Sequence, residues 1–333
     1  SFGQGSLWNK TTEDRVKSLS KMDRASMPRE YQLFSLDFNA LKAQLQQAVF
    51  GCYRSVIEDG SMAKIIQFGE IRADNLTGTN ASPTSDQTRF LNCNLNSGLS
   101  LVKWSEFYKT INNCNTVIDN ADKALQDPTL SQEELNAFKA EAKGIRALMY
   151  FYLVRSYQEV PLVLKSSDDD SHSYSVAKSR EEEVLNQVIK DLKEEKQSTM
   201  NKGRLTRVAI RAILADVYLW KLDYQSCNAE CDTILNENST LALVEGDYMY
   251  NEVYNQGNSA ESIFELQFDN SGKLNSNIYT IFGRGSAQKG NFMANAVKIG
   301  TLFTENPADI RLKYAFQSGG INYIVKFVAS SVS

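Results

Sequence analysis

The sequence predicts a mainly all-α fold built of helical hairpins, with long loops and a few short strands. Three observations support this prediction. Apolar residues recur at spacings of three and four along several stretches, two capping-box signatures mark helix starts, and only five prolines interrupt 333 residues. Strand-like alternation is confined to one short run, 262–268. Helices should therefore supply most of the core.

The first two helices are predicted from apolar periodicity. Residues 38–57 place Leu41, Leu45, Val49, Cys52 and Val56 on one face, and Gly60 follows the helix. Residues 104–125 repeat the pattern and end before Asp127 and Pro128. Both segments should bury one side and expose the other.

Two further helices are predicted from their starts. Ser131 is followed three residues later by Glu134, so that each side chain can satisfy a free backbone N–H of the first turn. That helix should continue to Tyr157. Ser179 and Glu182 repeat the signature and predict a helix through Leu192.

A helical hairpin is predicted near residues 209–235. Apolar residues in 209–218 and 227–235 flank the short turn 222–224, which favours antiparallel neighbours. The spacing is typical of a tetratricopeptide hairpin, with Cys227 and Cys231 at packing positions. Stacked hairpins of this type form a right-handed superhelical scaffold, which we expect over residues 35–240.

The remaining chain is expected to be rich in loops. Residues 75–98 are polar, with many Asn, Thr and Ser and no periodic apolar face. Glycines 283, 285 and 290 mark another loop within 241–333, which we expect to be a ligand-side region. Long loops commonly carry function.

Composition excludes several functions. The 36 Lys and Arg residues are outnumbered by 40 Asp and Glu, so no basic surface for nucleic acid is expected. No apolar run is long enough to span a membrane. The single histidine, His172, lies in a polar stretch and cannot build a histidine triad or a multi-histidine zinc site. An enzyme is therefore disfavoured.

Several polar or thiol groups have a structural alternative to a functional role. The pair Cys227 and Cys231 lacks further metal ligands, so core packing is favoured. Asp168, Asp169 and Asp170 lack the spacing of a calcium loop, which favours a solvated loop. Arg146 and Arg155 lie on an apolar helix and could clamp an anion, although pairing with a carboxylate such as Glu141 or Asp119 is favoured. No cofactor or metal is predicted.

Five stretches together resemble the SusD/RagB family of outer-membrane nutrient-binding lipoproteins. The strongest is EAKGIRALMYFYLVRSYQEVPL at 141–162, in which Gln158 replaces the usual glycine. WSEFYKTINNCN at 104–115 and GRLT at 203–206 are similar to two other family helices. ESIF at 261–264 and DIR at 309–311 add weaker matches. The order and spacing of these stretches follow the family pattern over most of the chain, from residue 38 to residue 327.

The resemblance implies that loops hold a glycan by an aromatic arc together with Asp, Asn and Arg. Planar polar groups pair with sugar hydroxyls, while an aromatic face covers the apolar side of a pyranose. Within 74–98 and the later loops, the candidate ligand-binding residues are Asp74, Asn75, Arg89, Phe90, Asn92, Asn94, Tyr279 and Phe282.

The resemblance also implies a place and a partner. Members are anchored by an N-terminal lipidated cysteine on the outward face of the outer membrane, and they deliver nutrient to a TonB-dependent SusC-type transporter without catalysis. No such cysteine stands at the start here, and the family pattern continues into further helices, so we expect the chain to be a fragment or to lack the C-terminal part. The alternative hypothesis is a tetratricopeptide-like scaffold that binds a protein or peptide and no sugar.

Overall fold

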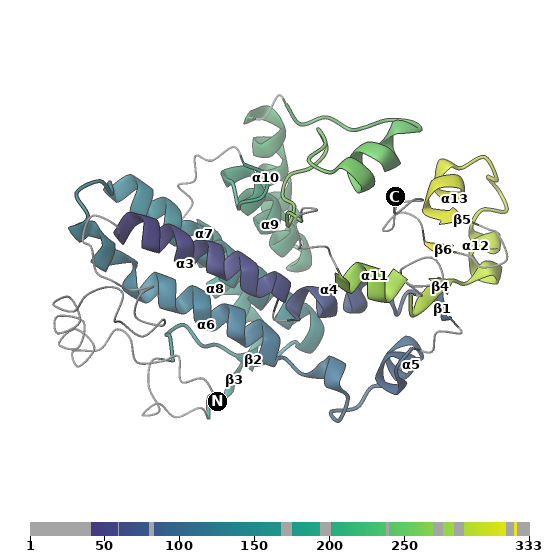
Figure 1. Ribbon diagram of the computed structural model, residues 1–333, viewed down its shortest axis with the longest axis horizontal. Helices are drawn as coiled ribbons and strands as arrows, with labels where there is room; N and C mark the ends of the chain where they lie inside the picture. Colours follow the sequence, from purple (N-terminus) through teal and green to yellow (C-terminus); the bar gives the residue numbers. More distant parts are fainter. Residues whose placement is uncertain are drawn as a thin grey trace, which may run out of the picture. The chain divides into compact units, whose positions relative to one another are not determined.

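The computed structural model is mainly helical, as predicted, and its strands are short (Figure 1). The structure describes residues 41–58, 60–79, 83–167, 175–193, 201–237, 240–268, 276–282, 290–317 and 323–324. His172 and the run of three aspartates at 168–170 lie outside the described residues. The described chain forms two compact units of interleaved segments, divided near residues 56, 106, 199, 204 and 227. This division does not follow the predicted boundary at residue 240.

Unit 1 contains the longest helices. Its elements are α3 (Leu41–Glu58), α6 (Ser105–Asn120), the 3-10 helix η4 (Ala121–Gln126), α7 (Gln132–Tyr157), β2 (Val160–Pro161), β3 (Lys178–Ser179), α8 (Glu181–Lys193), α9 (Arg207–Trp220) and the start of α10 (Tyr224–Glu237). The last residues of α3 and the first of α6 belong to unit 2. Strands β2 and β3 pair antiparallel, with Val160 opposite Ser179.

Helix α7 lies at the centre of unit 1. The capping box predicted at its start is confirmed, because the Ser131 hydroxyl accepts from the Glu134 N–H and the Glu134 carboxylate accepts from the Ser131 N–H. Large side chains such as Tyr150 and Phe151 are almost fully buried. Gly144 permits a close approach, since a Cβ there would lie 2.8 Å from Leu205 Cδ1. The length and burial of α7 make it the element around which unit 1 packs.

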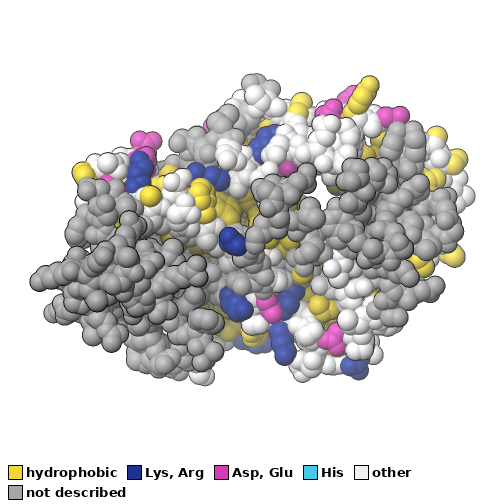
Figure 2. Space-filling view, viewed as in Figure 1, with side chains coloured by type: hydrophobic (Ala, Val, Ile, Leu, Met, Phe, Trp, Pro, Cys, Tyr) yellow, Lys and Arg dark blue, Asp and Glu magenta, His cyan; other side chains and the backbone are white. Residues whose placement is uncertain are grey.

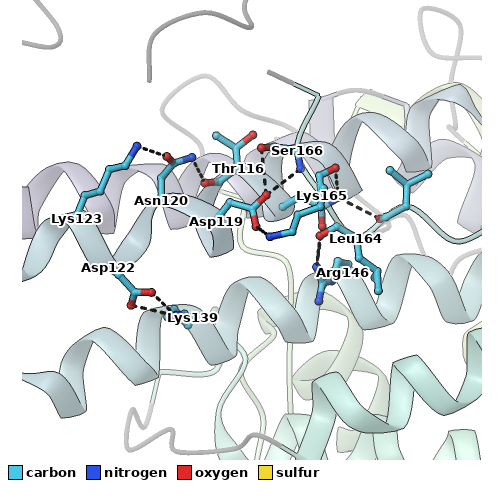
Figure 3. A network of polar contacts seen from close by, with 12 residues as sticks. Thr116, Asp119, Asn120, Asp122, Lys123, Lys139, Arg146, Leu164, Lys165 and Ser166 are labelled. Carbon is cyan, nitrogen blue, oxygen red and sulfur yellow. Dashed lines mark hydrogen bonds and ion pairs between the residues drawn. The ribbon is translucent and has the colours of Figure 1, made fainter. Parts of the chain in front are cut away.

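A buried ion pair joins α7 to α8. Arg146 donates through Nε and Nη2 to the two carboxylate oxygens of Asp191, both at 2.8 Å, and through Nη1 to Asn115 Oδ1 at 2.8 Å. Its guanidinium also reaches the Leu164 carbonyl (Figure 3). The predicted pairing of Arg146 with a buried carboxylate is confirmed, but neither suggested partner is the right one, because Glu141 accepts from the Tyr53 hydroxyl and Asp119 binds Lys165 and Ser166.

Helix α8 confirms the predicted segment but not its predicted cap. The helix begins at Glu181, one residue later than a cap at Ser179 requires, and Ser179 pairs in β3 instead. Three glutamates occupy the first turn, where negative charge is favoured by the helix dipole. The strand pairing explains why the sequence signature was misleading.

The two helices predicted within 209–235 are confirmed, and their turn has a defined cap. Leu222 has a positive φ of 62°, its N–H donates to the Leu219 carbonyl, and the Asp223 N–H donates to the Tyr218 carbonyl. Asp223 then caps α10 through its bond from the Ser226 N–H. The predicted core packing of the two cysteines is wrong for Cys231, which is exposed, whereas Cys227 is half-buried.

Unit 2 is built from shorter elements. They are α4 (Ser61–Glu70), β1 (Leu76–Gly78), α5 (Ser85–Leu91), η3 (Ser100–Val102), the π-helix η5 (Tyr250–Gln256), α11 (Ser276–Phe282), β4 (Phe292–Ala294), α12 (Ala296–Leu302), α13 (Ile310–Ala315), β5 (Phe316–Gln317) and β6 (Tyr323–Ile324). Strand β1 pairs antiparallel with β4, and β5 with β6. The strand predicted at 262–268 is wrong, because those residues take no regular structure.

The prediction of an irregular loop over 75–98 is also wrong in part. Thr84 and Gln87 form a capping box that starts α5, and Leu76 begins β1. The box is hard to recognise in the sequence because α5 is only seven residues long. Helices this short give too few turns for apolar periodicity to be recognised.

Charged side chains of both signs are interspersed with apolar ones over the described part of the face shown in Figure 2. Among the described helices, none combines the length and the apolar character required to cross a lipid bilayer.

We predict that Arg146→Ala lowers the free energy of unfolding by about 3–5 kcal/mol, because it leaves the Asp191 carboxylate buried without its counterion. The matched control is Lys139→Ala, which breaks the exposed pair with Asp122 visible in Figure 3 and should cost about 0.2–1 kcal/mol. Urea denaturation followed by circular dichroism measures both. Equal losses would contradict the importance assigned to the buried pair.

Candidate functional site

The predicted ligand residues Asp74 and Asn75 lie directly before β1 in unit 2. Asp74 is exposed and has a positive φ of 58°, while Asn75 is half-buried. The Asn75 carbonyl accepts from the Asn295 N–H at 2.7 Å, and Leu76 lies opposite Ala294 in the β1–β4 pair. This ladder places Asp74 and Asn75 beside the beginning of α12.

Segments that are far apart in the sequence meet here. Thr79 donates through its hydroxyl to the Gly290 carbonyl at 2.7 Å, and Asn291 donates through Nδ2 to Gln87 Oε1 at 2.9 Å. The predicted 75–98 region and the 241–333 region therefore contact each other within unit 2. The resemblance required loops from both parts of the chain to approach, and they do.

Phe90 and Phe282 are not accessible to a ligand. Their exposed fractions are 2% and 1%, and both belong to the hydrophobic core of unit 2 together with Ile71 and Phe292. The Phe90 ring stacks on Phe68 with centroids 5.2 Å apart. The predicted use of Phe90 and Phe282 as sugar-stacking surfaces is therefore corrected: burial of these large apolar rings stabilises the unit instead.

The polar residues around α5 remain available at the surface. Arg89, Asn92 and Asn94 are exposed at the C-terminal end of this helix. The Asn94 N–H donates to the Arg89 carbonyl at 2.8 Å, which holds the turn after the helix. Tyr279 belongs to α11, but its side chain lies outside the described residues.

A second group of residues in unit 2 combines aromatic and planar charged side chains. Tyr250 and Tyr254 lie one turn apart on η5, with ring centroids 5.5 Å apart and planes inclined by 25°. The Arg311 guanidinium lies 5.8 Å from the Phe303 centroid and forms a fork on Asp309, with Nη2 to Oδ2 at 2.6 Å and Nε to Oδ1 at 3.0 Å. We call Tyr250, Tyr254, Phe303, Asp309 and Arg311 the tyrosine–arginine cluster.

Electrostatics connect the two halves of this cluster. Hydrogen bonds from the Arg311 side chain and backbone lower the pKa of Asp309 to about 2. Asp309 in turn raises the pKa of Arg311. Burial and the neighbouring Tyr254 raise the pKa of Tyr250, on which the charge of Arg311 acts in the opposite direction. At neutral pH the cluster therefore presents an ionised Asp309 carboxylate and the Arg311 guanidinium beside the Tyr250 phenol.

The sequence contained a signal for this cluster. The segment 248–255 carries three tyrosines and two asparagines, and Asp309 and Arg311 stood in one of the stretches that resemble the family. Neither segment is predicted as a ligand site from the sequence, because nothing in their spacing shows that residues 55 to 61 positions apart belong to one cluster. Tyr254 is 48% exposed, so aromatic surface is accessible here.

These features define a mainly helical protein with surface groups suited to binding. Residues 21–219 match the SusD-like family described as "Starch-binding associating with outer membrane". Because the match covers more than half of the sequence, the chain belongs to the SusD-like family. Glycan binding is thus the activity by which this family is described.

Two relatives illustrate the extent of the sequence similarity. SusD-like protein P2 of Formosa agariphila is 25% identical over 214 residues, which cover 62% of this chain and 42% of that protein. A SusD-like protein of Bacteroides ovatus is 26% identical over 242 residues, covering 67% and 42%. The chain therefore spans less than half the length of these curated relatives.

Solved structures support the fold. A SusD superfamily protein from Bacteroides vulgatus superposes with a TM-score of 0.72 at 20% identity, covering 86% of this chain and 68% of that one. A laminarin-binding SusD-like protein gives a TM-score of 0.70 at 19% identity, covering 86% and 72%. At these identities the likeness concerns the fold alone.

We predict that Phe90→Ala lowers the free energy of unfolding by about 3–5 kcal/mol, because it leaves a cavity in the core of unit 2. Its neighbour Arg89 is exposed on the same helix, so Arg89→Ala should change stability by no more than about 0.5 kcal/mol. Urea denaturation distinguishes them. A Phe90→Ala protein as stable as the unchanged protein would show that the ring is not a core residue.

We also predict that the Asp309 carboxyl titrates near pH 2 in the folded protein, and that Arg311→Ala raises its pKa toward the ordinary value of 3.8. Because the folded-state pKa is the lower one, stability from this pair is present above about pH 4 and is lost as the pH falls through about 2. Carbon-detected NMR titration measures both values. An unchanged midpoint in Arg311→Ala would rule out the proposed cause.

Proposed function

We propose that this protein is a surface glycan-binding protein that delivers an oligosaccharide or polysaccharide to a TonB-dependent SusC-type transporter in the outer membrane. Family membership supports the association with starch-type glycans and with the outer membrane. The delivery step, an outward-facing position and a lipid anchor are parts of the proposal.

The tyrosine–arginine cluster is the observation that carries the proposal. Sugars present hydroxyl pairs at their edges and apolar C–H groups on their faces. Arg311 and Asp309 are joined by a fork of hydrogen bonds and can exchange further hydrogen bonds with vicinal hydroxyls, while the exposed Tyr254 ring offers a face for a pyranose. One compact surface thus supplies both kinds of contact.

The exposed polar residues near β1 and α5 form a second part of the proposed site. The exposed residues Asp74, Arg89, Asn92 and Asn94 supply carboxylate, guanidinium and amide groups, and the half-buried Asn75 adds a further amide. In this proposal they bind hydroxyls along an extended glycan. The buried Phe90 supports the helix that carries Arg89 and does not contact the sugar.

The proposed role is binding without bond cleavage. Glycoside hydrolysis needs a carboxyl group that stays protonated near neutral pH in order to protonate the leaving oxygen. Asp309 has the opposite property, since Arg311 holds its pKa near 2. The cluster is therefore arranged to hold an ionised carboxylate for hydrogen bonding.

We predict that affinity electrophoresis in gels containing laminarin or soluble starch retards the protein, and that Tyr254→Ala and Arg311→Ala each weaken the binding about three- to tenfold by removing a stacking face or a charged donor. The matched control is Tyr248→Ala, which removes a more exposed tyrosine that is not part of the stacked pair.

The outcomes separate the alternatives. Retardation that is lost in both cluster variants and kept in Tyr248→Ala supports the glycan site. Absence of retardation by a broad panel of polysaccharides would contradict glycan binding and favour a scaffold for a protein or peptide. Co-purification of the full-length protein with a TonB-dependent transporter from outer membranes tests the delivery step separately.

A further inference from the structure

Unit 1 contains an open cavity that the proposed glycan site does not use. Its volume is about 700 Å³, within the range typical of small-molecule sites. The cavity lies where α7 ends, α8 begins and α9 ends, with β3 beside it. We call it the α7–α9 cavity. Every residue that lines it belongs to unit 1, so its walls do not depend on the placement of unit 2.

Trp220 provides a fixed aromatic wall for this cavity. Its side chain is 44% exposed, which is unusual for the largest apolar residue in a protein with ample core. The buried Phe151 contacts the indole edge to face, with centroids 6.5 Å apart and planes at 85°. The indole Nε1 donates to Glu181 Oε1 at 2.8 Å. Two contacts therefore hold the ring while leaving part of it open to solvent.

Gln158 adds a polar group from a strained backbone position. It ends α7 with φ 63° and ψ −76°, a conformation that costs a non-glycine residue free energy. Its N–H donates to the Val154 carbonyl at 2.8 Å, and its exposed side chain lines the cavity. Glycine would take this conformation without strain. The side-chain amide of Gln158 is therefore present at a position where glycine would make the protein more stable.

The charges around the cavity balance one another. Three cations and three carboxylates line it, namely Lys178, Arg180, Lys221, Glu159, Glu181 and Glu182. A phosphate or a polyanionic chain would gain no net attraction from such a surface. Neutral hydroxyl groups, by contrast, can both donate to carboxylates and accept from ammonium and guanidinium groups.

We propose that the α7–α9 cavity binds a neutral saccharide, with a pyranose face on Trp220 and its hydroxyls bound by Gln158 and the surrounding charged side chains. This second subsite rests on the proposed glycan-binding function and adds a location in unit 1 to it.

The test measures binding of maltoheptaose and of laminarihexaose by isothermal titration calorimetry, in a protein that already carries Tyr254→Ala and Arg311→Ala. In this background, Trp220→Ala should weaken the remaining binding about three- to tenfold through loss of the stacking face. Gln158→Gly should weaken it about two- to fivefold, while leaving the thermal midpoint unchanged or higher because backbone strain is relieved.

Gln158→Gly keeps the proposal testable if Trp220→Ala fails to fold. Tyr224→Ala is the matched control, because Tyr224 is 59% exposed at the start of α10 and does not line the cavity. Weakened binding in Trp220→Ala and Gln158→Gly, with Tyr224→Ala unchanged, supports the subsite. Tryptophan fluorescence that becomes protected from acrylamide by the sugar, except in Trp220→Phe, supports it independently.

The experiment distinguishes failure of the second subsite from failure of the proposed glycan-binding function. If binding disappears completely in the Tyr254→Ala and Arg311→Ala background, the glycan function stands and the second subsite is overturned. If the otherwise unchanged protein binds neither oligosaccharide nor any polysaccharide, both proposals are overturned together. If Trp220→Ala leaves saccharide affinity unchanged but reduces co-purification with a transporter, the cavity is a protein contact and the saccharide proposal is overturned.

Discussion

The buried pair of Arg146 and Asp191 is the interaction on which unit 1 depends most. A guanidinium can be taken out of water only if its donors are matched by acceptors, and here two carboxylate oxygens and the Asn115 amide oxygen supply them. These partners come from α6 and α8, and Arg146 itself belongs to α7, so satisfying one charge fixes three helices at once. The Leu164 carbonyl brings the segment after β2 to the same point.

This requirement also fixes the geometry around the α7–α9 cavity. Helix α8 must present Asp191 to Arg146, which sets the position of its first turn and therefore of Glu181. Trp220 hydrogen-bonds to that glutamate from the end of α9. A buried polar contact in the middle of the helices is thus coupled to the arrangement of exposed groups at their ends.

Unit 2 follows a different physical rule, because its elements are too short to be stable individually. The pairing of β1 with β4 joins segments more than 200 residues apart, and the core of Phe90, Phe282 and their neighbours covers that pairing. Polar groups that can bind a ligand are then left at the surface. Phe90 and Phe282, which the sequence suggested as stacking surfaces, are buried in this core, whereas Tyr254 of η5 stays exposed.

The sequence by itself determined the helices of unit 1. Apolar spacing in 38–57, 104–125 and 209–235, and the box at Ser131, reflect local hydrogen bonds and one-sided burial, which are encoded within a few turns. It determined the family as well, since five ordered stretches are enough for a resemblance. It also indicated that the early polar region and the later loops would meet, although only through that resemblance.

Only the tertiary structure decided which side chains are accessible. Phe90 and Tyr254 are both aromatic residues next to polar neighbours, yet one is 2% exposed and the other 48%. The partner of Arg146 was equally undetermined, because Glu141, Asp119 and Asp191 are all acidic residues on helices, and only helix packing brings Asp191 within 2.8 Å. Burial and pairing are sums of contacts from distant segments, and no local pattern contains them.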